Sequence, residues 1–294
     1  MVLNNYKGGQ LANRIVSFAH LMANSIENKY ALINPEFDEF EQYFVSTQSN
    51  YFNGHAISTR LHKQYFIHQL YRRSIRFFTD VTHIFFATTP WYSLYRIFKR
   101  HDSKGIEFNL NEAAFIQAAK SRNVILQGWA FRDHTNFNKH ANVLRSLFAP
   151  VEKYNDLVQQ QMLVAKASAD VVFGIHIRRG DYKQFEGGKY YFDDAVYIDK
   201  MWQLYYQQKA IGNTCCFLIC TNEPIDGANF PTEFILCAQK RHFITDLYCL
   251  AACDGIVGPP SSFSTWASFY GKVPIQHICT KDDVIQLHHY ATIV

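Results

Sequence analysis

The sequence has no uninterrupted apolar stretch near the roughly 18 residues that a helix needs to span a bilayer. Its first residues also lack the succession of basic, apolar and small residues that marks a secretory signal. The seven cysteines are odd in number and all lie from Cys215 onward, which fits a reducing compartment better than a framework of disulfides. We therefore expect a soluble, cytoplasmic protein.

Several catalytic arrangements are missing as well. The chain has no Gly-x-Ser-x-Gly elbow, no Gly-x-x-x-x-Gly-Lys-Ser/Thr loop and no Asp-x-Asp pair that would hold a divalent metal beneath a diphosphate. The 13 histidines show no ligand spacing, and Cys249 and Cys253 share a predicted helix face with apolar neighbours, which predicts core positions. We expect no metal site, and a formal charge of +4 is too small to indicate nucleic acid.

The chain is long enough, at 294 residues and 48% hydrophobic, for one large or two medium domains. From Val171 onward, short β-prone runs alternate with helical stretches, which predicts βα units and a parallel sheet. Strands are expected at 171–177, 215–220, 233–237, 255–258 and 273–278, with helices near 194–209, 245–253 and from Ser261 or Ser262. This half is typical of a nucleotide-binding α/β domain.

The first half is predicted to be less regular. It opens on a Gly-Gly turn and continues with an amphipathic helix near 11–28 and a strand at 123–129. Pro150, which follows a predicted helix at 141–148, marks the expected boundary between a domain 1–150 and a domain 151–294.

Two adjacent arginines directly follow the predicted strand 171–177, within HIRRGDY (176–182). Arginine keeps its charge in a protein, and burying a pair of arginines near a sheet is unfavourable unless an anion meets them. We therefore expect an anion at this position. Ligands of α/β sheets gather at the carboxyl ends of the strands, where Arg178 can present a fork of donors to a phosphate. Arg179 is expected to tie the loop to Asp181 or another acid, and Gly180 permits the turn.

Other predicted strands end in polar residues at the same edge of the sheet. Thr221 and Asn222 follow the strand 215–220, Arg241 and His242 follow the strand 233–237, and a Pro-Pro-Ser-Ser-Phe-Ser run follows the strand 255–258. A pair of serines opening a helix offers hydroxyls and free backbone N–H groups to a phosphate, although a plain N-cap accounts for one of them. Asp181 and Glu186 lie downstream of the arginines, in a loop where a carboxylate could accept a proton from a sugar hydroxyl.

A basic and aromatic segment occupies residues 60–100, with eight Lys or Arg residues against the single acid Asp80. Such a mixture could bind peripherally to an anionic membrane surface, such as the inner face of a membrane, or it could hold an extended polar ligand. A helical region with a solvated basic face is the plainer interpretation. Nucleic-acid binding through this segment would predict a steep loss of affinity with salt, and we do not expect it.

Four motifs together resemble the fucosyltransferase superfamily: HIRRGDY (176–182), GGQLANR (8–14), LQGWAFRD (126–133) and the tail TDLYCLAACDGIVGPPSSFSTWAS (245–268). The first is similar to the His-x-Arg-Arg-Gly-Asp-Tyr of α-1,2-fucosyltransferases. The resemblance covers nearly the whole chain and implies an α/β, GT-B-like fold of two Rossmann-like domains facing a cleft. It also implies inverting, metal-independent transfer of L-fucose from GDP-fucose, with the donor held by the C-terminal domain and the acceptor on the side of the N-terminal one.

The resemblance also implies roles for particular residues. Arg178 would hold the diphosphate and stabilise the charge that grows as GDP leaves, His176 and Asp246 would bind the guanosine, and Asn13 and Arg14 would approach from the N-terminal domain. The related core α-1,6-fucosyltransferases place a glutamate where this chain has Glu186, and Asp181 stays an alternative base. The full set expected to bind GDP-fucose is Gly9, Asn13, Arg14, His176, Arg178, Arg179, Thr221, Asn222, Asp246, Ser261, Ser262, Phe263 and Ser264.

The function expected from these features is transfer of fucose to a glycan, an oligosaccharide or a lipid-linked saccharide, through an α-1,2 linkage to galactose. Two alternatives remain open. One is a transferase of the same architecture that uses another nucleotide sugar, and the other is a carbohydrate-binding protein without catalysis.

Overall fold

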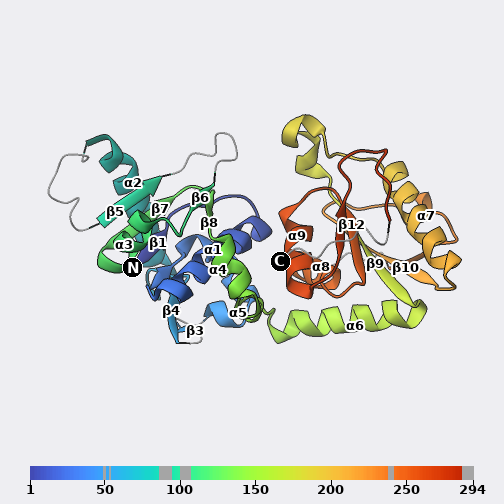
Figure 1. The fold of residues 1–294 in the computed structure, drawn as a ribbon, viewed down its shortest axis with the longest axis horizontal. Helices are drawn as coiled ribbons and strands as arrows, with labels where there is room; N and C mark the ends of the chain where they lie inside the picture. Colours follow the sequence, from blue (N-terminus) through green and yellow to red (C-terminus); the bar gives the residue numbers. More distant parts are fainter. Residues whose placement is uncertain (49–50, 53, 86–94, 100–106, 238–241, 287–294) are drawn as a thin grey trace. The chain divides into compact units, whose positions relative to one another are not determined.

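The computed structural model describes the chain except residues 49–50, 53, 86–94, 100–106, 238–241 and 287–294, and it divides into two units, Met1–Val151 and Glu152–Val294 (Figure 1). Each unit is built around its own parallel sheet with helices packed against it. The expected α/β fold class is confirmed, with a largely parallel sheet in each of two bodies.

Unit 1 holds a six-stranded sheet in the order β3-β4-β2-β1-β7-β5, in which only the pairing of β3 with β4 is antiparallel. A separate parallel pair joins β6 to β8. The strands are β1 (Val2–Asn4), β2 (Leu32–Ile33), β3 (Tyr51–Phe52), β4 (His55–Ser58), β5 (Tyr95–Lys99), β6 (Phe108–Asn109), β7 (Asn123–Gln127) and β8 (Phe131–Arg132). The helices are α1 (Leu11–Asn28), α2 (Tyr65–Phe85), α3 (Ala113–Ser121), α4 (His134–Lys139) and α5 (Ala141–Leu147).

Helix α1 spans the predicted residues because its apolar positions recur with the helical period and are buried, among them Ile15, Phe18 and Met22. Phe18 meets Phe37 and Phe148 edge to face at 5.1 and 5.7 Å between ring centroids. The six-stranded sheet corrects the expectation of an irregular first half. Strands β1 and β2 are three and two residues long, which is too short to display an alternating pattern.

Unit 2 contains a five-stranded, wholly parallel sheet in the order β11-β10-β9-β12-β13. The strands are β9 (Val171–Ile177), β10 (Cys215–Thr221), β11 (Ile235–Cys237), β12 (Gly255–Gly258) and β13 (Ile275–His277). The helices are α6 (Glu152–Ser168), α7 (Asp194–Ala210), α8 (Phe243–Leu250) and α9 (Ser262–Gly271). Each predicted strand and helix of this half is present, with ends displaced by a few residues.

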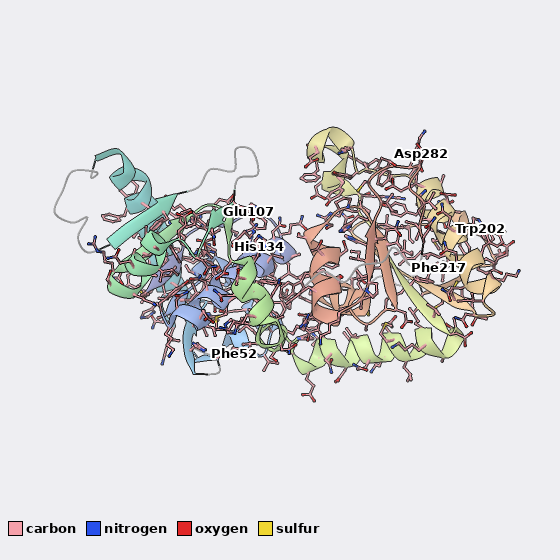
Figure 2. The ribbon with its side chains drawn as sticks, viewed as in Figure 1. Phe52, Glu107, His134, Trp202, Phe217 and Asp282 are labelled. Carbon is pink, nitrogen blue, oxygen red and sulfur yellow. The ribbon has the colours of Figure 1, made fainter. Side chains whose placement is uncertain are left out.

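Helices cover both faces of this sheet, so its central strands are buried along their length. One face carries Phe173, Ile175 and Phe217 against α7. The ring centroids of Phe217 and Phe234 lie 5.0 Å apart, and Phe234 contacts Trp202 of α7. Figure 2 labels Phe217 and Trp202. On the other face, a Cβ added to Gly174 would lie 2.6 Å from Leu250 of α8. A glycine at that position therefore allows α8 to approach the sheet closely.

Candidate active site

The strand order of unit 2 reverses direction beside β9. From β9 the chain moves to β10 and β11 on one side, and it then returns to β12 and β13 on the other. The connections that leave β9 and β12 therefore diverge at the carboxyl edge of the sheet, which is the point where open α/β sheets bind ligands. HIRRGDY leaves β9 there, and the Pro-Pro-Ser-Ser turn leaves β12.

His176 lies at this divergence and is only 3% exposed. Its ring stacks on the Phe263 ring, with 5.3 Å between the ring centroids and an interplanar angle of 30°. Burial, with smaller contributions from Arg178 and His277, lowers the pKa of His176 from 6.5 to about 3, so the imidazole is neutral near pH 7. Its buried Nδ1 has no hydrogen-bond partner among the described residues, which leaves that atom available to a polar ligand.

Gly258 brings β12 against β9 at the same place. A Cβ on Gly258 would lie 2.5 Å from the His176 carbonyl oxygen and 2.8 Å from its Cβ. The first of these neighbours is backbone and has little freedom to move. The close strand spacing that holds His176 therefore depends on a glycine at position 258.

The two arginines of the motif have different partners. Arg178 donates from Nη2 to Asp181 Oδ2 at 2.9 Å, and its guanidinium lies 5.4 Å from the centre of the Tyr182 ring. Arg179 forms an ion pair with Asp194, the first residue of α7. Arg179 was expected to pair with Asp181 or another acid, and the structure pairs it with the other acid, Asp194. Arg179 anchors the loop, whereas Arg178 pairs with a carboxylate that is itself half exposed.

Asn222, at the end of β10, clamps the arginine turn through the backbone. Its Oδ1 accepts from Arg179 N–H at 2.8 Å, and its Nδ2 donates to the Arg179 carbonyl oxygen at 3.3 Å. Gly180 has φ +57°, and a Cβ there would lie 2.9 Å from Asn222 Nδ2. Asn222 is therefore a residue that positions the loop, and Thr221 closes the adjoining turn by bonding both polar backbone atoms of Glu223.

Tyr182 joins the arginine turn to the turn that follows β12. Its hydroxyl donates to the Pro260 carbonyl oxygen at 2.7 Å while its ring lies under Arg178. Ser261 is the N-cap of α9 and accepts from Phe263 N–H at 3.3 Å. The start of α9, with its free N–H groups and partial positive charge, is thereby tied to the Arg178 loop. Tyr182 was not singled out from the sequence, although it closes the arginine motif.

The remaining serines and Asp246 are placed differently from one another. Ser262 and Phe263 are partly exposed, whereas Ser264 is buried and donates to the Ser261 carbonyl oxygen at 3.2 Å. Asp246 lies in the first turn of α8, and its carbonyl oxygen accepts a weak bond from Cys220, the residue paired with His176 in the sheet. Asp246 and His176 therefore belong to the same face of the sheet.

Both candidate carboxylates lie in the loop after the arginines. Asp181 is engaged by Arg178, and Glu186 is exposed. Glu186 has φ +48° and is followed by Gly187 and Gly188 at φ +70° and +81°. A left-handed conformation costs a non-glycine residue about 1–2 kcal/mol, and such strain gathers at functional sites.

The residues expected from the N-terminal domain lie in unit 1, with Gly9 in the loop between β1 and α1 and Asn13 and Arg14 near the start of α1. Gly9 has φ +64°, and a Cβ there would lie 2.2 Å from Asn13 Nδ2, so Asn13 packs directly on this glycine. Arg14 donates to the carbonyl oxygens of Gly9 and Glu36 at 3.2 and 3.0 Å and to Glu39 Oε2 at 3.0 Å. These bonds fix the Gly-Gly turn.

A small hollow opens beside Arg14, at the carboxyl ends of β1, β2 and β7. It is lined by Asn4, Tyr6, Gly8, Arg14, Ser17, Asn34, Glu36 and Trp129. Of this set, the sequence motifs include Gly8, Arg14 and Trp129. Asn4 and Asn34 were missed because β1 and β2 are too short to be recognised.

No group of three or more His, Cys, Asp or Glu side chains that could hold a metal ion occurs in the part of the chain that the structure describes. Cys249 and Cys253 are buried, as expected for core residues. Within the described residues, no helix is both long and apolar enough to cross a membrane.

Comparison with protein-family models found no match, and comparison with curated proteins found none either. Solved structures do match. A mutant of Arabidopsis thaliana FUT1 in complex with GDP superposes with a TM-score of 0.57 at 15% identity, covering 93% of this chain and 69% of that one. NodZ α-1,6-fucosyltransferase soaked with GDP-fucose gives 0.55 at 14%, covering 94% of both chains. POFUT1 in complex with GDP-fucose gives 0.54 at 11%, covering 92% and 94%. The chain therefore has an α/β fold with parallel sheets in two bodies that matches GT-B fucosyltransferase structures.

Proposed function

We propose that the protein transfers L-fucose from GDP-fucose to a glycan by an inverting reaction that needs no metal, with an α-1,2 linkage to galactose. The observation that carries this proposal is the placement of Arg178 at the point where the connections from β9 and β12 diverge, tied through Tyr182 to the start of α9. A diphosphate at this point would meet a guanidinium fork and the N–H groups of a helix terminus. The fold shared with GDP-bound and GDP-fucose-bound fucosyltransferases supports it.

In the proposed reaction the acceptor hydroxyl oxygen forms a bond to C1 of fucose from the face opposite the nucleotide. The bond between C1 and the β-phosphate oxygen breaks, and GDP leaves with the electron pair. Arg178 would stabilise the charge that grows on this oxygen, with its guanidinium passing from Asp181 to the diphosphate. Arg179 stays paired with Asp194 and holds the loop.

The hydroxyl proton would pass to a carboxylate of the same loop. Glu186 is the stronger candidate, because it is exposed and is held in a left-handed conformation, whereas Asp181 is already engaged by Arg178. His176, neutral and with a free buried Nδ1, would hydrogen-bond the guanosine together with Asp246. Ser261, Ser262 and Phe263 would contact the phosphates.

Titration calorimetry tests the donor assignment. Purified protein is titrated with GDP, GDP-fucose, GDP-mannose, UDP and UDP-galactose, each with and without EDTA. Binding of GDP and GDP-fucose that ignores EDTA and disappears in Arg178→Ala supports the proposal. Arg122→Ala removes the same charge from an exposed position of unit 1 and should bind like the wild type. Preference for a uridine nucleotide, or loss of binding in EDTA, would refute the donor assignment.

Substitution of the two carboxylates distinguishes a transferase from a carbohydrate-binding protein. Glu186→Gln should abolish transfer and leave GDP affinity unchanged, because the base acts only on the acceptor proton. Asp181→Asn should retain transfer, since it removes a partner of Arg178 and not the base. The reverse result would make Asp181 the base, and glycan binding with no turnover in any variant would favour the non-catalytic alternative.

A further inference from the structure

Helix α2 is oriented with its polar side inward. In its described part the buried side chains are His68, Arg72 and Thr79, at 0%, 6% and 0% exposure. Soluble proteins bury the apolar side of a surface helix and expose the charged side. The opposite arrangement here requires polar partners beneath the helix, and it leaves an apolar stripe on its outer side.

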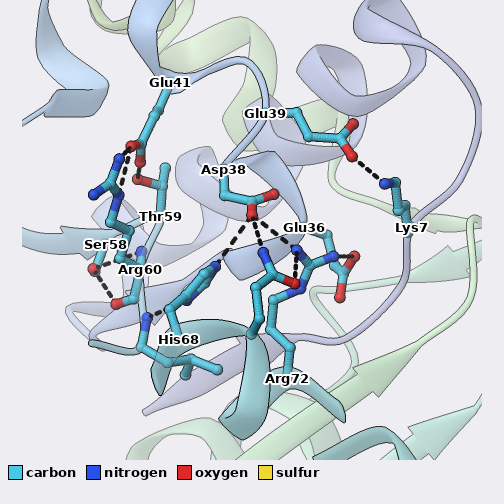
Figure 3. Close-up of polar contacts among 12 residues, drawn as sticks. Lys7, Glu36, Asp38, Glu39, Glu41, Ser58, Thr59, Arg60, His68 and Arg72 are labelled. Atoms are coloured by element: carbon cyan, nitrogen blue, oxygen red, sulfur yellow. Dashed lines mark hydrogen bonds and ion pairs between the residues drawn. The ribbon is translucent and has the colours of Figure 1, made fainter. Parts of the chain in front are cut away.

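The polar partners of the inward face lie in unit 1 (Figure 3). Arg72 bridges two buried carboxylates, with Nη2 2.7 Å from Glu36 Oε2 and Nη1 2.8 Å from Asp38 Oδ2. His68 Nε2 lies 3.2 Å from the same Asp38 oxygen. Thr79 Oγ1 accepts from Asn5 and Gln127 side chains, which follow or end strands of the sheet. His68, Arg72 and Thr79, the buried side chains of the inward face, therefore each have polar partners in unit 1.

The outward stripe consists of Phe66, Leu70, Arg73 and Phe77, spaced i, i+4, i+7 and i+11 on one helix face. Phe66 is 79% exposed, Leu70 52% and Phe77 72%, and Arg73 is exposed as well. Further exposed aromatic residues flank the stripe at Tyr65, Tyr71 and Phe78. A contiguous apolar patch of this kind marks a surface that something else covers.

The charges on this face indicate what covers it. Exposed Lys63 lies just before the helix and exposed Arg73 lies within the stripe, and there is no acidic residue between Arg60 and Thr79. A second copy meeting this face about a twofold axis would place like charges together. A neutral saccharide would not pair with these positive charges and would not cover the apolar side chain of Leu70. A surface with an apolar interior and a negatively charged exterior is complementary both to the apolar stripe and to the cations beside it.

We propose that the outward face of α2, the stripe Phe66, Leu70, Arg73 and Phe77 with Lys63, seats unit 1 on an anionic lipid surface. The aromatic and leucine side chains enter the boundary between headgroups and acyl chains, and the two cations meet lipid phosphates. The contact is peripheral. This inference goes beyond the proposed transfer reaction and does not depend on it.

Vesicle co-sedimentation of the full chain tests the inference without substrate or activity. Vesicles of phosphatidylcholine are compared with vesicles that also hold about 30 mol% phosphatidylglycerol, at low salt and at about 0.5 M NaCl. The protein should sediment with the anionic vesicles at low salt and less so at high salt. Phe66→Ser combined with Phe77→Ser should lower the partition coefficient about tenfold or more. Lys63→Glu combined with Arg73→Glu should remove the preference for anionic vesicles.

The matched control is Leu163→Ser combined with Val164→Ser, because these side chains are 73% and 63% exposed on α6 of unit 2. This variant should sediment like the wild type, and thermal unfolding should show all variants folded. A wild type that ignores anionic vesicles, or a stripe variant that sediments equally well, would overturn the inference. A wild-type dimer that the stripe variant converts to monomer would assign the face to a second copy instead.

Discussion

Replacing Gly258 with alanine tests the close approach of β12 to β9 that frames the candidate site. The added methyl carbon would start 2.5 Å from the His176 carbonyl oxygen, about 1 Å inside an ordinary contact distance. Because the nearest atom is backbone of a buried central strand, the strands must separate. Such overpacking typically costs about 1–3 kcal/mol. For a unit of this size, a loss of about 2 kcal/mol lowers the unfolding midpoint by about 4–8 °C.

Calorimetric or fluorescence-detected thermal unfolding measures this loss, and Gly227→Ala is the matched control. Gly227 lies in the same unit, has a φ outside the left-handed region, and a Cβ there meets nothing within 4 Å. The control should unfold within about 1–2 °C of the wild type, because open surface positions change stability by less than about 0.5 kcal/mol. If Gly258→Ala unfolds at the same temperature as this control, the close packing of β12 on β9 is not what the site depends on.

Three other predictions follow from the described contacts. Asn222→Ala removes both bonds to the Arg179 backbone and should weaken GDP binding by about tenfold in calorimetry while leaving the unfolding temperature within about 2 °C. The pKa of His176 is lowered from 6.5 to about 3, so only the unfolded chain takes up this proton as the pH falls below 6.5. The free energy of unfolding should therefore fall as the pH is lowered. Urea titrations at about pH 5 and pH 7.5 measure this fall, which should be smaller in His176→Gln than in the wild type. A fall of the same size in both would refute the assignment. Arg72→Met leaves two buried carboxylates without their bridge and should cost about 3–5 kcal/mol. Lys139→Ala removes an exposed ion pair with Glu27 and should lower the free energy of unfolding far less than Arg72→Met does. Equal losses in urea titration would contradict this account.

The second half of the chain was predictable because its strands are buried on both faces. VVFGIHI and CCFLIC are largely apolar runs of seven and six residues bounded by polar turns, and the structure places β9 and β10 on them. The first half was harder, since β1 and β2 carry two or three residues each. Such strands are recognisable only from their pairing, which joins Val2 to Leu32 and to Val124.

The site was predictable in its charges but not in its pairings. Two adjacent arginines after a strand indicate an anion site from local chemistry alone. Which acid each arginine takes depends on how the turn is bent, and Gly180, Asn222 and the start of α7 set that bend. The link from Tyr182 to Pro260 spans 78 residues of sequence and has no local signal.

Residue order alone settled the helices with clear periodicity, the buried strands of unit 2 and the cationic motif that ends β9, because each depends on neighbours within a few positions of the chain. Folding settled the strand order that makes β9 and β12 diverge, the partner of each arginine, and the direction in which α2 turns its two faces. An amphipathic sequence shows that a helix has two sides. Only the buried carboxylates Glu36 and Asp38, brought beneath α2 from more than 30 residues away, determine that the polar side is the inner one.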